Sequence, residues 1–462
     1  RSVMSEELRE NKMGTMPVRR LVLSMSLPMM IAMLVQALYN VVDSMFVARV
    51  SENALTALSM AFPIQNLMIA VSAGLGVGLN AVLSRALGAK DEKGVNRAAT
   101  NGIMLLFICG LVFMLGGATI VRPYFEMQTD IAEIVESGVD YTTIVMLGSM
   151  GIFMQILFER LLQSTGRTLL TMVSQGVGAI ANIILDPIFI FGLFGVPKMG
   201  VAGAAYATIL GQWIAAAIGL VMNIRKNPEV SISMKGFRPH GATIRRILSI
   251  GIPSVVMQSI GSIMTFLMNQ ILIAFSATAV AVFGVYFKLQ SFVFMPVFGL
   301  NNGTVPIVAY NFGARRGDRM RQTIKYSICA AVAIMIVGML MFQSIPDKLL
   351  RLFDASEEML RLGVPALRII SLCFLPAAFG IMSSSIFQAT AHGFLSLWGS
   401  LLRQLVGILP LAWILAAVGG VDLVWFSFPL AELIGTVYFA AALKHLYRTE
   451  IRRLDIVEEN AF

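Results

Sequence analysis

Two aspartates within long apolar segments are the residues whose type and position point to chemistry. Asp186 lies in residues 175–192, an apolar stretch long enough to lie inside a bilayer, and Asp43 lies in the first apolar segment. A carboxylate at the centre of a membrane helix costs roughly 2.5–3.5 kcal/mol on insertion scales, and such residues mark ion and proton pathways. Together the two aspartates predict ion coupling in a transporter.

Each aspartate belongs to a row of polar or small residues at helical spacing, and a third row follows them. The rows are Gln36, Asn40 and Asp43; Gln175, Gly178, Asn182 and Asp186; and Ala204, Thr208 and Gln212. Residues three and four apart share one face of a helix. The rows supply carboxylate, amide and hydroxyl oxygens, which are the ligands that hard cations prefer. Pro187 interrupts helical hydrogen bonding directly after Asp186, so a backbone carbonyl can be available there as well.

The elements that carry these rows are predicted to be membrane-spanning helices. The chain has 462 residues, of which 57% are hydrophobic and 13% charged, whereas about 25% of residues in soluble domains are charged. Its apolar runs exceed the roughly 20 residues that a spanning helix needs and lack the alternation of barrel strands. We therefore expect an all-α polytopic membrane protein with twelve spans. They cover approximately residues 21–49, 56–84, 97–121, 140–163, 168–193, 200–224, 246–274, 280–311, 321–345, 364–389, 395–419 and 422–446.

The distribution of charge predicts the topology. The formal net charge is +9, but the Lys and Arg residues gather in short loops between apolar runs, which is typical of cytoplasmic loops. This pattern favours contact with anionic lipid over binding of nucleic acid. The basic segments are residues 1–20, 85–97, 225–246, 315–325 and 444–453, and acidic residues gather on the opposite side in residues 126–136. We expect both termini to be cytoplasmic.

The chain repeats itself at one constant offset, the separation between Pro28 and Pro253. The same repeat offset pairs Gln65 with Gln290, Gly74 with Gly299, Gly78 with Gly303, and Thr165 with Thr390. Six spans per repeat give both halves the same orientation, so the sequence predicts two pseudo-symmetric six-helix bundles (6+6, a parallel repeat). The expected organisation is an N-terminal lobe at 1–224, a cytoplasmic linker at 225–246 and a C-terminal lobe at 247–462. The paired glycines have the small-xxx-small spacing that permits close helix packing.

The repeat does not extend to the charges. At the repeat offset Asp43 corresponds to Met268, Asn182 to Gly407 and Asp186 to Leu411. One interpretation is that the aspartates are buried, hydrogen-bonded packing residues. Their restriction to one repeat favours the other, an ion or proton site.

Other intramembrane polar residues allow more than one interpretation. Glu159 and Arg160 form either an interfacial pair or part of a cavity lining. Lys288 either contributes to substrate binding or gating, or has no functional role. Arg403 and Glu432 either pair with each other or face the cavity. The thirty methionines suit an adaptable apolar pocket. The candidate residues for a substrate cavity are Gln36, Asn40, Gln175, Glu159, Lys288 and Met268.

These motifs resemble the multidrug and toxic compound extrusion (MATE) family over essentially the whole chain. The resemblance is carried by residues 182–192 (Asn-Ile-Ile-Leu-Asp-Pro-Ile-Phe-Ile-Phe-Gly), residues 200–208, Pro28 and Asp43 in the first span, and residues 163–166. Acidic residues in the N-terminal half resemble the bacterial MepA- or DinF-like subgroup. Spans 246–274 and 364–389 contain no Asp or Glu, so a NorM-type C-terminal ion site is in doubt.

The resemblance implies efflux of lipophilic, cationic drugs, and hence antibiotic resistance, by antiport against H+ or Na+ through alternating access. Carried over by position, the ion site comprises Asp43, Asn182, Asp186, Thr208 and the carbonyl of Ala204. If Na+ is the coupling ion, the first four residues are the ones that would bind it. No cofactor is implied beyond the coupling ion. We expect small-molecule substrates, surrounding membrane lipids and a monomer.

Four rival functions share some of these features. A lipid-linked-precursor flippase of the same superfamily commonly has two further spans and a cationic cavity, and an exporter of an endogenous metabolite would share the present architecture. A major-facilitator transporter also has 6+6 spans, but residues 88–94 do not match its Asp-Arg loop. An intramembrane aspartyl protease would need a Gly-x-Gly-Asp element, which the sequence lacks, and no other hydrolase or nucleotide-binding motif is present. We therefore expect a transporter and not an enzyme.

Overall fold

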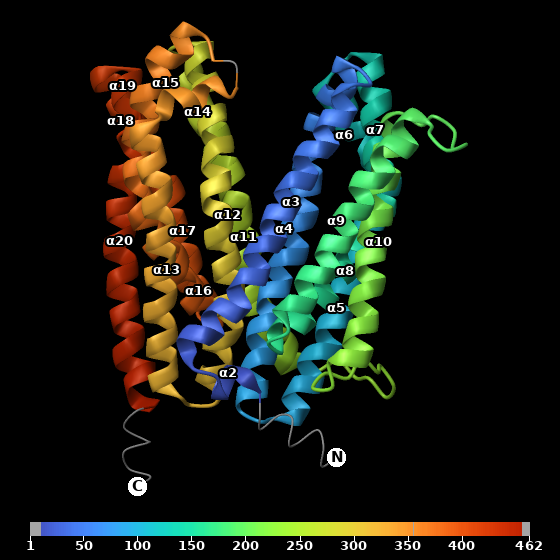
Figure 1. The fold of residues 1–462 in the computed structure, drawn as a ribbon, viewed down its shortest axis with the longest axis vertical. Coiled ribbons are helices and arrows are strands. Elements are labelled where there is room, and N and C mark those ends of the chain that lie inside the picture. Colours follow the sequence, from blue (N-terminus) through green and yellow to red (C-terminus); the bar gives the residue numbers. More distant parts are fainter. Residues whose placement is uncertain (1–10, 354, 455–462) are drawn as a thin grey trace. The chain divides into compact units, whose positions relative to one another are not determined.

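The computed structural model describes residues 11–353 and 355–454 (Figure 1). Residues 1–10 and 455–462, which include both predicted cytoplasmic termini, lie outside the described residues. Within the described ranges eleven helices are long and apolar enough to cross a membrane. A twelfth span results when α7 (Ala132–Leu147) and α8 (Met150–Ser164), which are bent by 45° to each other, are taken as one. The predicted all-α, multi-span fold is confirmed.

The spans follow the predicted order, and most helices extend a few residues beyond the predicted bounds. The first repeat contains α3 (Val18–Ala48), α4 (Glu52–Gly88), α5 (Glu92–Thr119), the α7 and α8 pair, α9 (Thr168–Phe191) and α10 (Val201–Lys226). The second contains α11 (Gly241–Ile273), α12 (Ala277–Gly313), α13 (Gly317–Ser344), α15 (Glu357–Ile370) with η1 (Ser371–Cys373) and α16 (Phe374–Ala389), α17 (Gly393–Leu401) with η2 (Leu402–Gly407) and α18 (Ile408–Gly419), and α19 (Val421–Val424) with α20 (Ser427–Leu446) and η3 (Tyr447–Ile451). The short helix α2 (Lys12–Thr15) precedes the first span, and α6 (Val121–Gln128) and α14 (Pro346–Arg351) lie between spans.

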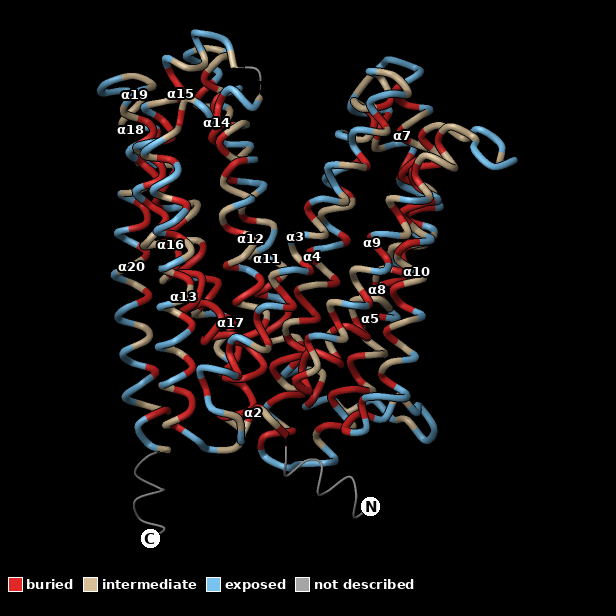
Figure 2. Tube along the Cα trace, in the orientation of Figure 1, coloured by how far each residue is buried: buried red, intermediate tan, exposed pale blue. Residues whose placement is uncertain are grey.

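Large apolar side chains are exposed along the spanning helices. Leu115 is 68% exposed, Trp413 70% and Val437 71%, and exposed positions recur along α13 and α20 (Figure 2). Soluble monomers rarely expose so much contiguous apolar surface. These faces are therefore suited to lipid, as the composition predicts.

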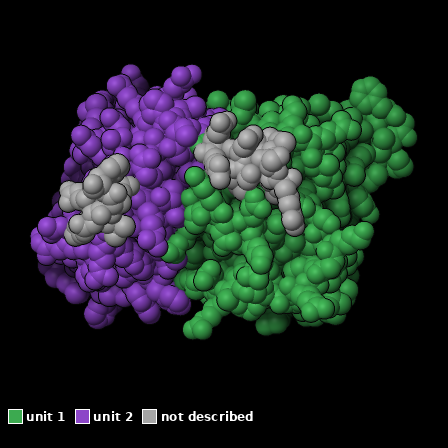
Figure 3. All heavy atoms as spheres, turned by 90° about the horizontal axis from the view of Figure 1, so that it is seen from below, with its two compact units in different colours: residues 1–11, 31–255 green, residues 12–30, 256–462 purple. Residues whose placement is uncertain are grey.

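The described chain divides into two compact units that share the sequence unequally. Unit 1 comprises residues 1–11 and 31–255, and unit 2 comprises residues 12–30 and 256–462 (Figure 3). The division therefore falls inside α3 and α11, and not at the predicted lobe bounds of 224 and 247. In unit 2, α2 and the C-terminal end of α20 lie at the same end (Figure 1).

Close packing at the paired glycines explains this division. In unit 1 a Cβ on Gly74 would lie 2.7 Å from the backbone nitrogen of Val255 on α11, and one on Gly78 would lie 2.3 Å from the carbonyl oxygen of Ile247. In unit 2 a Cβ on Gly299 would lie 2.6 Å from the Cα of Met30 on α3. The first half of α3 thus packs on α12, and the first half of α11 packs on α4. The predicted role of these glycines in close helix packing is confirmed.

The repeat extends to backbone details. Ser51 caps α4 by accepting a hydrogen bond from the Ala54 amide at 2.9 Å, and Ser276 caps α12 in the same way at 3.1 Å. Lys90 and Arg315, which are related by the repeat offset, both have a φ of 56° in the turn after these helices. One departure is η2, a π-helical turn that has no counterpart in α9. A π-turn adds a residue to a helix, so the register after it shifts.

Candidate functional site

The candidate ion site lies within unit 1, where α3, α9 and α10 bring three of the predicted rows together. Asp43 and Asp186 are electrostatic neighbours and lie close enough to share a hydrogen bond when one of them is protonated. Asp186 is fully buried and Asp43 is 7% exposed. Close packing of α9 on α10 supports this arrangement, because a Cβ on Gly178 would lie 2.7 Å from the Gly211 carbonyl oxygen.

Several oxygen atoms in this cluster have no fixed partner. Among the described residues, Asp43 Oδ1, Asn182 Oδ1 and both carboxylate oxygens of Asp186 are buried and form no hydrogen bond. Buried polar atoms are nearly always satisfied, so a group of orphaned acceptors needs an explanation. A proton or an oxygen-seeking cation would satisfy them. In residues 11–353 and 355–454 no three His, Cys, Asp or Glu side chains converge, so amide and hydroxyl oxygens would have to complete any cation's coordination.

Thr208 and Ala204 lie buried on α10, one helical turn apart. The Thr208 hydroxyl donates to the Ala204 carbonyl at 3.0 Å. Within α10 the Ala204 carbonyl, which the family resemblance implies as a ligand, also accepts the backbone amide of Thr208, so both of its lone pairs are used inside the helix. The bond from the Thr208 hydroxyl aims the lone pairs of the hydroxyl oxygen away from its own helix, where they can accept from or coordinate another group.

Tyr39 is a member of this cluster that sequence reasoning missed. Its hydroxyl lies within hydrogen-bonding reach of Thr208 and Asn182, and Asp43 and Asp186 are its charged neighbours. The signal for it was present, because Tyr39 precedes Asp43 by four residues and so shares its helix face. A phenol beside two carboxylates can donate to either one and hold its orientation.

A second tyrosine closes the cluster from α7. Tyr141 is buried and lies in the field of Asp43, Asp186 and Tyr39. Its hydroxyl accepts a hydrogen bond from Gln65 Nε2 at 2.9 Å, which leaves its own proton for another acceptor.

The other residues of the first two rows lie along the same helices. Gln175 Nε2 donates to Gln36 Oε1 at 3.3 Å, which joins α9 to α3 inside unit 1. Asn40 is exposed. The two glutamines therefore belong with the aspartates, whereas Asn40 is directed out of the cluster.

The remaining cavity candidates are not part of this cluster. Glu159 is buried on α8 and accepts from Gln155 Nε2 at 3.0 Å, while its neighbour Arg160 donates to Gln163 Oε1 at 3.2 Å. Lys288 is exposed on α12, with its ammonium 5.9 Å from the ring centroid of Phe353. Met268 is fully buried within unit 2.

Unit 2 buries a different kind of polar pair. Arg403 Nε lies 3.3 Å from Glu432 Oε1, and both side chains are about nine-tenths buried. Of the two interpretations offered for these residues, pairing with each other describes their geometry. The buried Glu432 carboxylate is thus paired with a fixed cation through Oε1, although its Oε2 atom forms no hydrogen bond within the described chain.

Comparison with known proteins identifies the family. The MatE family model matches residues 28–188 and, in the second repeat, residues 253–414. The multidrug export protein MepA of Staphylococcus haemolyticus is 28% identical over 414 residues, which cover 88% of this chain and 89% of that protein. MepA of Staphylococcus aureus strain MW2 is 27% identical over 90% of this chain and 91% of its own.

Solved structures with a similar fold agree with this assignment. A multidrug resistance MATE family transporter of the MOP superfamily, in an outward-facing conformation, matches with a TM-score of 0.89 and 27% identity over 96% of this chain and 98% of that one. A MOP superfamily transporter from Pyrococcus furiosus, described as having a binding pocket of reverse polarity, matches with a TM-score of 0.88 and 26% identity over the same shares. The chain belongs to the MatE family, as its motifs and its double six-span repeat predict.

Proposed function

We propose that this protein exports lipophilic cationic compounds across a bacterial cytoplasmic membrane in exchange for H+ or Na+. The observation that carries the proposal is the pair of buried carboxylates, Asp43 and Asp186, in which Asp43 Oδ1 and both Asp186 oxygens have no hydrogen-bond partner within the described chain. Family membership and relatives named as multidrug export proteins favour a drug as cargo over a lipid-linked precursor.

The coupling step follows from electrostatics. Two carboxylates side by side in a water-poor interior repel each other, so the site gains by taking up a positive charge. A proton or Na+ arriving from outside would relieve the repulsion and change the packing of α3, α9 and α10. Tyr39, Asn182 and Thr208 would orient the carboxylates, and in Na+ coupling the Asn182 and Thr208 oxygens would coordinate the ion. Antiport requires ion and drug to oppose each other, and this coupling is reciprocal.

Alternating access and topology complete the proposal. Two halves of the same orientation can rock to open a central site to each side in turn. The basic loops favour a cytoplasmic location for both termini and for residues 225–246. Reporters fused in that segment should read cytoplasmic and one near Glu133 external; a cytoplasmic reading near Glu133 would contradict the topology.

The decisive test is dye efflux from proteoliposomes under separately imposed pH and Na+ gradients. We expect one of the two gradients to drive export of an ethidium-like cation. Efflux that ignores both gradients would overturn the proposal, and a response to Na+ alone at fixed pH would assign sodium as the coupling ion.

Dye affinity provides a second measurement. If a proton is the coupling ion, purified protein should bind the dye more weakly as pH falls, because protonation of the pair removes the negative charge that attracts a cation. The pH dependence should vanish in Asp186→Asn. Identical pH profiles for wild type and variant would remove these aspartates from the coupling mechanism.

A further inference from the structure

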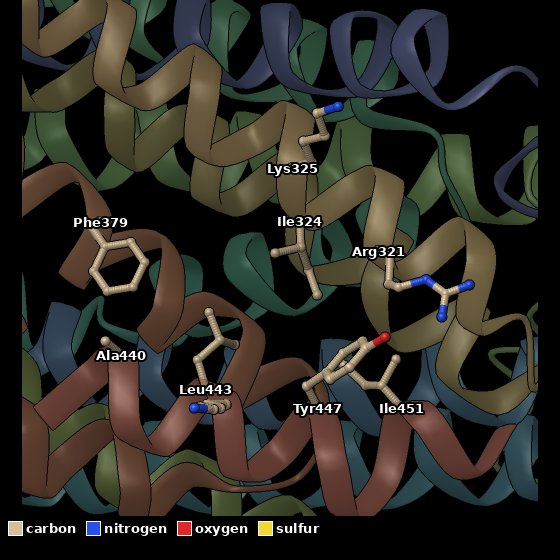
Figure 4. Close-up of a pocket in the computed structure, with 9 residues that line it drawn as sticks. Arg321, Ile324, Lys325, Phe379, Ala440, Leu443, Tyr447 and Ile451 are labelled. Atoms are coloured by element: carbon tan, nitrogen blue, oxygen red, sulfur yellow. The ribbon is translucent and has the colours of Figure 1, made fainter. Parts of the chain in front are cut away.

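A pocket in unit 2 lies outside the candidate ion site. It has a volume of about 430 Å³ and lies between the first turns of α13 and the end of α20, with a contribution from α16 (Figure 4). Its lining combines positively charged side chains, one phenol and a set of apolar residues. None of these residues was a candidate in the sequence analysis.

The lining is divided into a polar end and an apolar end. Figure 4 shows the guanidinium of Arg321 and the hydroxyl of Tyr447 toward one end, with Phe379 and Ala440 at the other. Lys325 and Lys444 add two further positive charges to the lining. A pocket of this polarity suits a molecule with an anionic head and an apolar chain.

The apolar part of the pocket is held in place by the core. Ile324, Phe379 and Leu443 pack against a buried cluster that includes Phe387 and Phe439. The polar end is shaped by η3, the π-helical turn that begins at Tyr447 and ends at Ile451, both of which line the pocket. Single π-turns inside α-helices occur frequently at functional sites.

The pocket lies at the end of two spanning helices. Arg321 follows the first residue of α13 by four positions, which is roughly 6 Å along the helix axis. Basic pockets between spanning helices, near their cytoplasmic ends, bind anionic lipid heads. Phe379 and Leu443 continue from there along the spans.

The positive charges are not part of the repeated scaffold. At the repeat offset, Arg321 and Lys325 correspond to Asn96 and Thr100, which are neutral. The turns that precede these helices do match, because Lys90 and Arg315 share their φ of 56°. At these two positions, positive charge is therefore present in the second repeat and absent from the first.

We propose that this pocket binds an anionic phospholipid. Its phosphate would lie at the end formed by Arg321 and Tyr447, and one acyl chain would lie over Leu443, Phe379 and Ala440. The other conceivable occupants are a free phosphate ion and the chain's own residues 455–462, which contain Asp455, Glu458 and Glu459 and lie outside the described residues.

The test is native mass spectrometry of the full-length protein in detergent, titrated with phosphatidylglycerol and, separately, with phosphatidylcholine of the same chain length. We expect preferential retention of phosphatidylglycerol. Arg321→Gln should weaken it about fivefold, since a basic residue near a membrane surface contributes roughly 1 kcal/mol to anionic lipid binding. Ala440→Trp should weaken retention of phosphatidylglycerol by filling the apolar end while leaving every charge in place.

Matched controls separate the alternatives. Arg448→Gln removes the same charge from an exposed residue that does not line the pocket, and it should leave retention unchanged. Thermal melting of each variant establishes that it is folded. Equal retention of the two lipids, equal loss in Arg448→Gln and Arg321→Gln, or displacement of lipid by an equimolar concentration of inorganic phosphate would overturn the proposal. Phosphatidylglycerol binding that appears only after removal of residues 455–462 would assign the pocket to the chain's own tail instead.

Discussion

The two repeats use one scaffold to bury negative charge in two ways. In unit 1, Asp43 and Asp186 lie together with no cation beside them, and Asp43 Oδ1 and both Asp186 oxygens form no hydrogen bond within the described chain. In unit 2, Glu432 is held 3.3 Å from Arg403. A carboxylate paired with a fixed cation has less to gain from a mobile ion than an uncompensated pair of carboxylates. The difference supports the proposal that ion coupling belongs to unit 1 and that the pair in unit 2 is structural.

A second comparison shows the same divergence near the ends of the helices. Arg167 Nη2 lies 3.1 Å from Glu229 in unit 1, and His392, the repeat equivalent of Arg167, has its Nε2 atom 2.8 Å from Glu450 in unit 2. In each repeat the pair connects the segment that follows the last span (α10 or α20) to the turn that precedes the fifth span (α9 or α17). Only the second pair depends on protonation of an imidazole.

The largest effect should follow neutralisation of the unit 1 pair. Asp186→Asn or Asp43→Asn should reduce coupled efflux to the level of protein-free liposomes, because no ion charge can then be exchanged for the drug. Met268→Ala, at the repeat equivalent of Asp43, should do much less. Proteoliposome efflux measures this, and equal damage from Met268→Ala would show that the site assignment is wrong.

The effects on stability should rank in the opposite order to the effects on efflux, with the unit 2 pair more sensitive than the unit 1 pair. Arg403→Met leaves the buried Glu432 without its partner and should destabilise the protein by about 3–5 kcal/mol. Asp43→Asn and Asp186→Asn each remove an uncompensated negative charge, so they should leave the stability unchanged or raise it. Thermal unfolding in detergent measures both. Adding Glu432→Gln to Arg403→Met should restore much of the loss. Collapse of the aspartate variants would instead favour their interpretation as packing residues.

Alanine substitution of the equivalent glycines should destabilise the two units equally. A Cβ on Gly78 would meet the Ile247 carbonyl oxygen at 2.3 Å, and one on Gly303 would meet the Ser26 Cα at 2.7 Å. Gly78→Ala and Gly303→Ala should each cost about 1–3 kcal/mol through overpacking. Gly176→Ala is the control, because its Cβ would meet no atom within 4 Å. A loss confined to one unit would contradict equivalent packing in the two repeats.

The smallest effect should come from the His392 and Glu450 pair, whose side chains are about one-third exposed. His392→Ala should lower the stability by an amount typical of exposed pairs, below about 1 kcal/mol. Arg167→Ala should cost more, because it removes a partner of Glu229, whose side chain is only 4% exposed. Thermal unfolding in detergent measures both, and equal losses would remove the distinction between the two pairs.

Much of the fold could be predicted because its signals are local or repeat exactly along the chain. Apolar runs define the spans to within a few residues, and the repeat offset relates Gly74 and Gly299 before any coordinates are known. The aspartates stand out because charge in an apolar helix is costly. Tyr39 did not stand out, since a tyrosine in a membrane helix is unremarkable until its spacing from Asp43 is considered.

Other features could not be predicted because they depend on which elements meet in space. Helical periodicity gives the buried face of α3 but not its partner, so the packing of its first half within unit 2 was missed. Likewise, nothing in the order of residues 402–407 signals a π-turn. The basic pocket combines α13, α16 and α20, and its residues become neighbours only after these helices pack.

The exchange of helix halves has a consequence for biosynthesis. Unit 1 includes residues as late as 255, and unit 2 includes residues as early as 12. A nascent chain that has emerged only through its sixth span therefore lacks residues 241–255 and cannot complete unit 1. Separately translated halves would each miss a segment encoded in the other, so neither half-gene specifies a self-sufficient protein even though each encodes a full repeat.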